Sequence, residues 1–304
     1  MLKPRILFSR CFFEHVRYNA GIVVDNFVEN LKKYVETIYV CPEVEIGLGV
    51  PRPFMIVSQE KNGKRLIQPE TGLDLTERIV SFVENFVKNL DRIDGVILKS
   101  KSPSCGVSST KLHKDGTVIG RTNGFFAEGL KKAFPLLPIE DEGRLKDKDI
   151  KYHFLTRVYS LCELRNLLEN PSAKGLVEFH SRYKYLLMTY SQKALKELGN
   201  VVADGKLSLD QKLSRYKEVF SEALMKKTTN KKHVNTLMHI YGHISKKLNA
   251  KERKHFQELL EKYRKNTIEL RVLIELIKSF AYRFENDYIL IQKYLEPFPE
   301  ELVV

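Results

Sequence analysis

The sequence is poor in cysteine. Its 304 residues contain four, and no two of them form a Cys-x-x-Cys pair. With 43% hydrophobic residues, a chain of this length can bury a core in each of two domains without disulfide bonds. Sparse cysteines of this kind favour a metal or redox role over a disulfide framework. They are Cys11, Cys41, Cys105 and Cys162.

Long hydrophobic runs are also missing. No run approaches the roughly 18 apolar residues of a membrane-spanning helix. The opening residues, MLKPRILFSR, lack the apolar segment of a signal peptide. We therefore expect a cytoplasmic protein that does not contact a membrane.

Positive charge is in excess, and most of the excess lies in the second half. The net charge is +13. Residues 1–150 hold 23 lysines and arginines against 20 acidic residues, whereas residues 151–304 hold 28 against 18. This asymmetry indicates a polyanionic partner for the second half. A basic surface that serves only solubility remains the alternative.

Three of the cysteines follow short hydrophobic segments. Residues 5–9, 37–40 and 95–98 read as buried strands, and a polar loop follows each of them. In an open α/β sheet the chemistry lies where parallel strands end in such loops. If the three strands lie side by side, the thiols that follow them converge. These thiols belong to Cys11, Cys41 and Cys105.

The first half alternates between strand and helix signals. Apolar residues recur at helical spacing within 24–35, 75–90 and 125–134, and residues 54–58 and 65–68 flank an Asn-Gly turn. This alternation predicts an α/β fold, with a Rossmann-like, mostly parallel sheet and helices on both faces. We expect this domain to cover residues 1–145.

The second half is predicted to be helical throughout. A charged stretch at 140–149 reads as a linker, and strand signals stop after it. An all-α, basic domain is therefore expected over residues 150–304. Asn249 followed by Glu252 predicts a capping box. Cys162 falls on an apolar helix face, which makes it a core residue rather than a ligand.

Spacing alone leaves the cofactor open. Three thiolates could hold zinc together with His15, which lies four residues after Cys11, or they could hold an iron-sulfur cluster with one iron left free. A free iron would be a Lewis acid able to take a soft sulfur atom from a substrate.

At these cysteines the sequence resembles a known family. SRCFFEHVRYNAG, CPEVEIGLGVPR and KSKSPSCG are similar to the three signature blocks of the thiouracil desulfurase (TudS) family. FHSRYKYLLMTYSQ, VNTLMHIYGHISKKL and IQKYLEPFPEEL resemble a helical domain of unknown function that is fused to it. Together the two halves resemble the RudS group of tRNA 4-thiouridine desulfidases.

The resemblance implies a cofactor and a reaction. A 4Fe-4S cluster would be held by Cys11, Cys41 and Cys105, with the fourth iron free of protein ligands. The reaction would convert 4-thiouridine in tRNA to uridine without electron exchange and release hydrogen sulfide. Glu43 matches the family's acid/base carboxylate and Ser102 its catalytic serine.

Other residues of these blocks are predicted to contact the substrate. Arg17, Tyr18 and Asn19 belong to the first block and are expected to line the pocket, although Arg17 could form a surface ion pair and Asn19 a turn. Ser104 is the alternative to Ser102, and either serine could instead satisfy amides of its own loop.

The helical domain is expected to bind the RNA backbone through lysine and arginine, and therefore in a salt-dependent manner. His239 and His243 have the i, i+4 spacing of a zinc pair but no third ligand, so we do not predict a metal there. The candidate RNA-binding residues are Arg182, Lys184, Lys231, Lys232, Lys246, Lys247, Lys251 and Arg253.

Two alternatives stay open. The same chemistry could act on free thiouracil or another small thio-compound, with no need for the second half. Alternatively, the chain could be a non-enzymatic RNA-binding protein whose cysteines hold structural zinc. If tRNA is the substrate, the thiolated base must leave its stack to reach the site, so we expect a flipped nucleotide.

Overall fold

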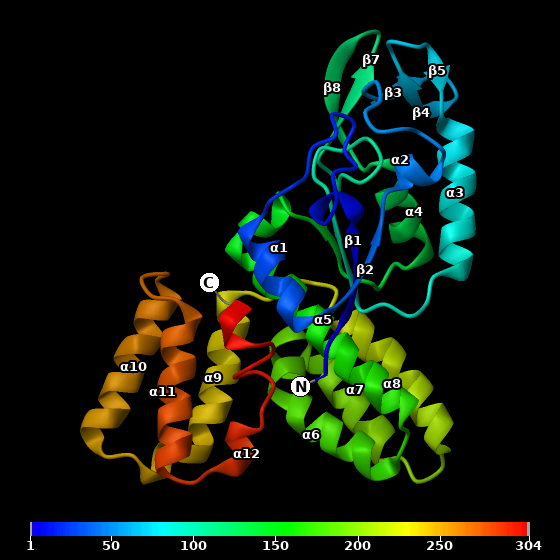
Figure 1. Ribbon diagram of the computed structural model, residues 1–304. Coiled ribbons are helices and arrows are strands. Elements are labelled where there is room, and N and C mark those ends of the chain that lie inside the picture. Colours follow the sequence, from blue (N-terminus) through cyan, green and yellow to red (C-terminus); the bar gives the residue numbers. More distant parts are fainter. Residues whose placement is uncertain (1, 303–304) are drawn as a thin grey trace. The chain divides into compact units, whose positions relative to one another are not determined.

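The computed structural model describes residues 2–302 (Figure 1). The chain divides into two units. One runs to Cys162 and includes Glu301 and Leu302, and the other runs from Glu163 to Glu300. The division falls within helix α5 (Lys148–Glu169).

The first unit is built on a four-stranded sheet in which every strand pairing is parallel. The strand order is β2-β1-β6-β9. The central position of β1 confirms that the three strands predicted to deliver cysteines are neighbours. The strands are β1 (Arg5–Ser9), β2 (Glu36–Val40), β6 (Gly95–Leu98) and β9 (Ile139–Asp141).

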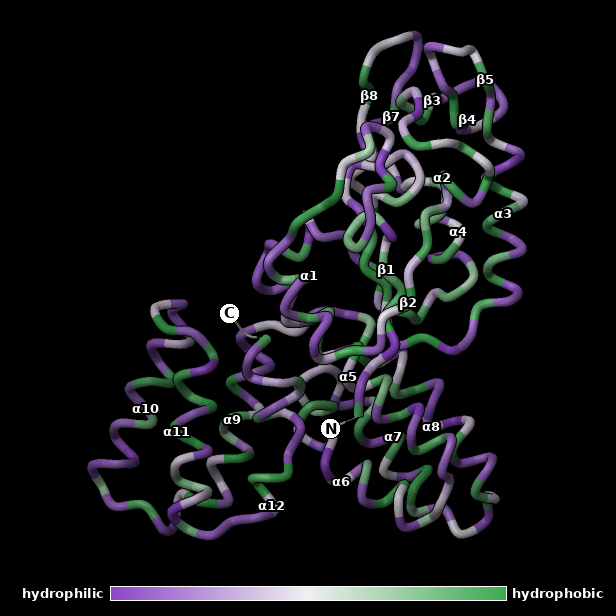
Figure 2. Tube along the Cα trace, in the orientation of Figure 1, coloured by the Kyte–Doolittle hydropathy of each residue, from purple (hydrophilic) through white to green (hydrophobic). Residues whose placement is uncertain are grey.

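β1 is hydrophobic because both of its faces are covered. Ile6, Leu7 and Phe8 are all fully buried, and Figure 2 shows the hydrophobic colour along β1. A parallel strand covered on both faces reads as a continuous apolar run rather than an alternating one. Phe8 lies opposite Tyr39 of β2 and Ile97 of β6, which fixes the register of the three strands.

Helices cover the two faces of this sheet. In Figure 1 the sheet stands between α1 (Asn26–Leu31) on one side and α3 (Thr76–Asn89) and α4 (Phe125–Ala133) on the other. Leu7 and Val96 share one core with residues of α3 and α4. The predicted α/β fold, with a following helical region, is confirmed.

A glycine at the start of β6 allows a close helix contact. A Cβ atom built on Gly95 would lie 2.7 Å from Cγ2 of Val158 and 3.5 Å from Cζ of Phe154, both on α5. No real side chain fits in that space. Gly95 therefore lets α5 pack directly against the beginning of a central strand.

A second, five-stranded sheet was predicted only in part. The hairpin of β3 and β4 corresponds to the expected one, but the β7–β8 hairpin lies in a stretch that carried no strand signal. Only the β3–β7 pairing is parallel. The order is β5 (Leu73–Asp74), β4 (Gly63–Gln68), β3 (Ile56–Glu60), β7 (Thr110–Lys114) and β8 (Thr117–Thr122).

The charged stretch 140–149 is not an extended linker. It forms the end of β9, the short helix η3 (Arg144–Lys146) and the start of α5. Asp141 is fully buried, and Glu142 is 7% exposed. These charged residues led to the prediction of a linker, but both carboxylates form hydrogen bonds with loops of the first unit.

The second unit is helical, as expected. Figure 2 shows hydrophobic and hydrophilic residues alternating along α10 and α11, typical of helices that bury one stripe. No helix within residues 2–302 combines the length and apolar character needed to cross a membrane. The helices are α6 (Ala173–Tyr190), α7 (Gln192–Ala203), α8 (Leu209–Ala223), α9 (Asn230–Ile244), α10 (Ala250–Arg264), α11 (Leu270–Arg283) and α12 (Asp287–Leu290).

Two local predictions for the helical region are confirmed. Asn249 and Glu252 form the capping box at the start of α10, with a bond in each direction between side chain and backbone. Cys162 is 1% exposed, as expected of a core residue. Met238 has the helical spacing of the buried residues of α9 but is 38% exposed, because it lies at the edge of this apolar stripe.

Candidate active site

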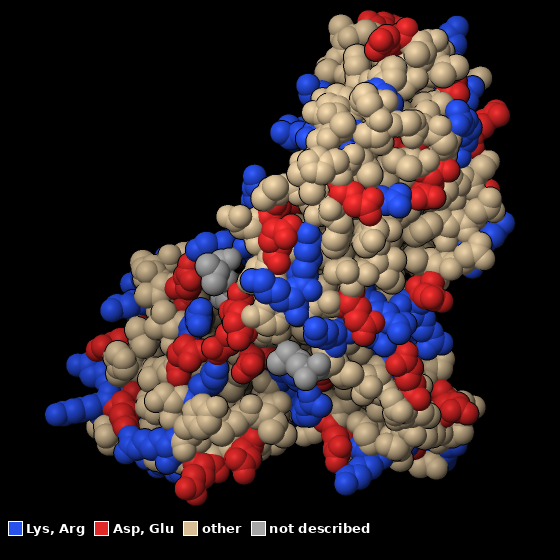
Figure 3. Space-filling model, in the orientation of Figure 1, with Lys and Arg blue, Asp and Glu red and all other residues tan. Residues whose placement is uncertain are grey.

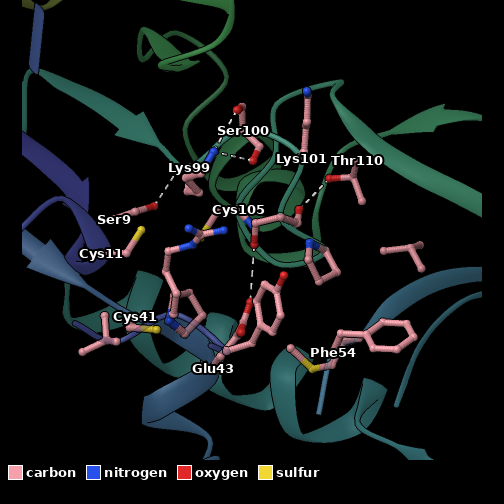
Figure 4. A pocket seen from close by; sticks show the side chains of 18 of the residues that line it. Ser9, Cys11, Cys41, Glu43, Phe54, Lys99, Ser100, Lys101, Cys105 and Thr110 are labelled. Carbon is pink, nitrogen blue, oxygen red and sulfur yellow. Dashed lines mark hydrogen bonds between the residues drawn. The ribbon is translucent and has the colours of Figure 1, made fainter. Parts of the chain in front are cut away.

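Three cysteines line one cavity at the carboxyl ends of three neighbouring strands. Cys11 lies in the short helix η1 (Arg10–Phe12) after β1, Cys41 directly follows β2 and precedes α2 (Pro42–Glu45), and Cys105 lies in the loop after β6. The cavity has a volume of about 610 Å³. Figure 4 shows the three sulfur atoms facing a common space.

Burial sets the acidity of these thiols. It raises the pKa of Cys11 to about 12, with a further contribution from Cys41. Burial followed by the charge of Glu43 raises the pKa of Cys41. Burial also raises the pKa of Cys105 well above its ordinary value, against an opposing hydrogen bond with Ser9. Three thiols that influence one another in this way need added positive charge to become thiolates.

The loop that carries Cys105 is held by its own polar groups. The Ser102 hydroxyl oxygen accepts bonds from the backbone amides of Ser104 (3.2 Å) and Cys105 (3.1 Å). The Thr110 hydroxyl donates to the Ser102 carbonyl at 2.6 Å. From the end of β9, buried Asp141 accepts the amide of Val107 at 3.0 Å. The position of Cys105 is therefore determined by several elements.

Gly124 lies very close to the backbone of the same loop. A Cβ atom on Gly124 would lie 2.4 Å from the carbonyl carbon of Ser104 and 2.7 Å from the amide nitrogen of Cys105. Only glycine allows the start of α4 to approach the cysteine loop so closely.

Glu43 lies on α2, and its two oxygens have different partners. Oε1 accepts from the hydroxyl of Ser104 at 3.1 Å and lies 3.4 Å from the hydroxyl of Ser102. Oε2 accepts from Nε (2.9 Å) and Nη2 (2.6 Å) of Arg52. The carboxylate is thus fixed by Arg52 on one side and presented to the serines on the other.

Arg52 also ties this carboxylate to the loop that carries Arg17 and Tyr18. Its Nη2 donates to the carbonyl of Val16 at 3.0 Å, its Nη1 donates to the carbonyl of Gly49 at 3.1 Å, and its backbone amide donates to the carbonyl of Tyr18 at 2.8 Å. Its side chain is only 4% exposed. Arg52 closes the second signature block, but its role was not predicted from the sequence.

A second ion pair faces Cys11. Lys99 follows β6 directly, lines the cavity and pairs with buried Glu142. The Ser100 hydroxyl donates to Glu142 Oε1 at 2.7 Å. Lys99 opposes the rise in the pKa of Cys11 that burial causes. The sequence carried no signal for this pair, because its partners are separated by β7, β8 and α4.

The predicted substrate residues divide into two groups. Arg17 and Tyr18 line the cavity, as does Ser102. Ser104 is fully buried behind the loop and contacts Glu43 only from there. Asn19 is not among the lining residues, and its side-chain oxygen accepts the amide of Gly21 at 3.3 Å.

Lining residues in or near the second sheet were also missed. His113 of β7 lines the cavity, and its buried Nδ1 has no hydrogen-bond partner among residues 2–302. Phe54 lines it too and is 52% exposed. Both come from the second sheet or its approach, so they could not be assigned to the site before that sheet was known.

His15 does not join the three cysteines. It is exposed, lies outside the cavity lining, and its Nδ1 is 3.1 Å from the carbonyl oxygen of Ala20. Within residues 2–302 no three His, Cys, Asp or Glu side chains are grouped closely enough to hold one metal ion. A single zinc ion bound by three cysteines and His15 is therefore not supported.

The predicted RNA-binding cations differ in their bonding partners. In Figure 3 lysine and arginine side chains stand among aspartates and glutamates on the face shown. Arg182 pairs with Glu163 at 2.7 Å, and Lys232 donates to the Tyr190 carbonyl at 2.7 Å. Lys231, Lys246 and Lys251 are exposed, with no such bond in the described part of the chain.

The fold and this cavity define an open-sheet α/β domain with its chemistry at the carboxyl ends of parallel strands. Residues 6–142 match the model of the 2-thiouracil desulfurase family. Residues 184–299 match a family described as protein of unknown function (DUF1722). The first half of the chain is therefore similar to 2-thiouracil desulfurases, and most of the helical unit is similar to a family without an assigned function.

Individual relatives cover about half of the chain. The uncharacterized protein YbgA of Escherichia coli (strain K12) is 29% identical over 148 residues, which are 48% of this chain and 88% of that protein. A solved structure of a [4Fe-4S]-dependent thiouracil desulfidase, TudS, is 26% identical, with a TM-score of 0.37. That likeness covers 48% of this chain and 95% of the solved one.

Proposed function

We propose that this protein is an iron-sulfur-dependent desulfidase that converts 4-thiouridine in tRNA to uridine and releases hydrogen sulfide. The observation that carries the proposal is the common cavity of Cys11, Cys41 and Cys105, with Glu43 and Ser102 beside them. The family match of residues 6–142 supports removal of sulfur from a thiolated nucleobase.

The donor set fits a 4Fe-4S cluster. Three buried thiols line the cavity, and the fourth cysteine, Cys162, is not among the lining residues. Burial opposes their conversion to thiolates, so three thiolates in this cavity would need positive charge close to the sulfur atoms. Iron supplies the missing positive charge, and thiolates are the ligands that iron-sulfur clusters use.

When bound, a cluster with three protein ligands would offer a Lewis-acid iron that binds the thiocarbonyl sulfur. Around it the chain supplies acid/base groups. Glu43 is held by Arg52 through Oε2, which leaves Oε1 to accept a proton from water or deliver one to the base nitrogen. The net change is hydrolysis: water provides the oxygen and two protons, and sulfur leaves as hydrogen sulfide.

Ser102 is better placed than Ser104 to touch the substrate. Ser102 lines the cavity, while Ser104 has no exposed surface. The Ser102 oxygen already accepts two backbone amides, so its hydroxyl proton can be donated to Glu43 or to the substrate. Ser104 fixes Glu43 from behind.

The helical domain is proposed to hold the tRNA by its backbone. Its excess of positive charge supports this role, because phosphate contacts dominate the affinity of proteins for nucleic acid. The site itself lies in a cavity, so a thiolated base would have to flip out of its stack to reach it.

A second candidate function is desulfuration of a free thiobase. Every residue that lines the cavity comes from the first unit, between Ser9 and His113. Its volume of about 610 Å³ is within the range of small-molecule sites. The first unit therefore holds the complete set of site residues for a small substrate.

One experiment separates the two. The full chain, reconstituted with iron and sulfide without oxygen, is given thiolated tRNA and free thiouracil in parallel. We expect the near-ultraviolet absorbance of the thiolated tRNA to fall as hydrogen sulfide is released, and thiouracil to react more slowly. If iron-loaded protein desulfurates thiouracil but leaves tRNA unchanged, the tRNA assignment is wrong.

A further inference from the structure

The structure sorts the predicted RNA-binding cations by their position on α9. Lys231 and Lys232 lie in its first turn, whereas Lys246 and Lys247 lie just beyond its carboxyl end, in the short helix η4 (Ser245–Lys247). A 15-residue helix is about 20 Å long. The two pairs therefore belong to different surfaces of the helical unit.

Aromatic rings that reach the surface gather at the carboxyl end of α9, whereas His233 and Tyr294, whose rings pack together at its amino end, are buried. At the carboxyl end the Tyr185 hydroxyl oxygen lies 2.6 Å from Nε2 of His243. The His243 ring is 5.6 Å from the ring of Tyr288 on α12, and the two tyrosine rings are 6.3 Å apart. Three helices, α6, α9 and α12, thus contribute one ring each to a packed cluster.

Tyr185 determines how His243 is held. Burial, and then neighbouring Tyr288, raises the pKa of Tyr185, so its phenol is protonated at neutral pH. His243 is exposed, so its contact with the buried Tyr185 hydroxyl holds the imidazole ring at the surface.

Cations are interleaved with these rings. The ammonium of Lys184 lies 5.5 Å from the ring centre of Tyr185 and 5.9 Å from that of Tyr288. A second cation lies near Phe284, the residue that follows α11. The ammonium of Lys247 is 5.7 Å from the ring centre of Phe284, and its Nζ is 3.4 Å from the Phe284 carbonyl oxygen. Contacts of this kind hold a cation against an aromatic face.

Acidic residues also lie near the cluster, but basic residues outnumber them. Glu252 is bonded to Arg283, whose guanidinium lies 5.0 Å from the ring centre of Phe284. Glu285 is exposed in the turn that follows α11, and Asp287 is exposed at the start of α12. The exposed cations Lys246, Lys247, Lys251 and Arg253 lie in η4 and in the first turn of α10, so they outnumber these three acidic residues.

We propose that this aromatic–basic surface binds unpaired nucleotides of the RNA, with bases against the rings of Tyr288 and Phe284 and phosphates at Lys184 and Lys247. The inference rests on the proposed tRNA substrate and names the surface that receives it. Rings interleaved with cations suit unpaired nucleotides, because every base has a face to stack and every nucleotide a phosphate. The surface comprises Lys184, His243, Lys247, Phe284 and Tyr288, and the buried Tyr185 packs against His243 and Tyr288.

The test measures binding, not catalysis. Full-length protein is titrated into fluorescent tRNA, a single-stranded RNA and a blunt RNA duplex over a range of salt concentrations. The variants are K184Q/K247Q and Y288L, and the matched control is K231Q/K232Q at the other end of α9. Thermal unfolding confirms that each variant is folded.

We expect K184Q/K247Q to bind tRNA at least tenfold more weakly and to lower the salt slope by about two, one for each lost phosphate contact. Y288L should weaken single-stranded RNA about tenfold with an unchanged salt slope, because stacking is not ionic. K184R/K247R should restore most of the affinity, and K231Q/K232Q should cost less than threefold.

The proposal is overturned if K231Q/K232Q loses as much affinity as K184Q/K247Q, or if the duplex is bound as tightly as the single strand. It is also overturned if the wild-type chain has no affinity for RNA, or if an acidic polypeptide competes as well as RNA does. A chain that binds RNA through this surface yet leaves thiolated tRNA unchanged would contradict the proposed reaction and leave the surface in place.

Discussion

Arg52 shows how much of the site depends on one buried ion pair. Its side chain is 4% exposed and that of Glu43 is 12% exposed. When one member of such a pair is removed, the other is left as an uncompensated charge, which costs about 3–5 kcal/mol. We predict that R52M lowers the stability of the first unit by about that amount and abolishes desulfuration.

A double variant separates the charge from the contact. E43Q/R52M removes both charges and should unfold at a higher temperature than R52M while remaining inactive. Thermal and denaturant unfolding of the wild type, both single variants and the double variant give the coupling between the two residues. If the double variant is less stable than R52M, the loss of stability in R52M does not come from the uncompensated charge of Glu43.

Substituting the two serines is predicted to affect kcat and stability to different extents. S102A removes a cavity hydroxyl and the acceptor of two amides in the cysteine loop, so it should lower kcat about 100-fold or more and also lower stability. S104A removes a buried donor to Glu43 and should cost about 1–3 kcal/mol of stability, with a smaller loss of kcat. Steady-state kinetics and unfolding on the same samples distinguish them. Equal kcat losses would contradict the assignment of Ser102.

At this scale the sequence predicts ligands better than positioning groups. Cys11, Cys41 and Cys105 could be found because each follows a hydrophobic strand. Arg52 and Lys99 could not, since a guanidinium or ammonium on a loop looks like any surface cation until packing shows its partner. Asn19 illustrates the opposite case: it adjoins the predicted pocket in sequence, yet its side chain bonds within its own turn.

At the scale of elements, the approach of α4 to the cysteine loop gives the next prediction. G124A places a Cβ atom against the backbone of Ser104 and Cys105, so one of the two segments must move. We expect less iron per chain and a lower melting temperature. G120A, where an added Cβ would meet nothing within 4 Å, is the matched control. Full iron content in G124A would contradict this role of the glycine.

Element prediction succeeded where burial is strong and failed where it is weak. β1 and β6 are apolar and buried on both faces and are therefore recognisable, whereas β2, which was expected to be buried as well, is mostly exposed. The β7–β8 hairpin is largely exposed, with no clear alternation, and was missed, although Asp115 and Gly116 adopt the positive φ values of a tight turn. The charges of 140–149 predict a linker, because the burial of Asp141 and Glu142 depends on tertiary contacts that the sequence does not show.

At the scale of the whole molecule, stability should depend on pH through a buried histidine of the helical unit. Burial lowers the pKa of His233 to about 4, from 6.5, and its ring bonds to Tyr294 at 3.0 Å and Thr228 at 2.7 Å. Between these two values the unfolded chain binds a proton that the folded chain does not. Stability is therefore complete above pH 6.5 and is lost as the pH falls toward 4.

The expected loss is about 3 kcal/mol, because a tenfold difference in proton affinity between the folded and unfolded chain corresponds to about 1.4 kcal/mol. Urea unfolding at pH 7.5 and pH 4.5 measures it. In H233Q the neutral amide takes no proton, so its stability should change less over this interval than that of the wild type. An equal change in both proteins would assign the pH dependence to other groups.

The most direct test of the account is the iron and acid-labile sulfide content of protein prepared without oxygen, in the wild type and four single variants. We predict a brown wild type with about four irons and four sulfides per chain, as a 4Fe-4S cluster requires. C11S, C41S and C105S should lose colour and iron, whereas C162S, altered only in a buried helix position, should keep both. A colourless wild type would contradict the account, as would C11S, C41S and C105S variants that keep their iron.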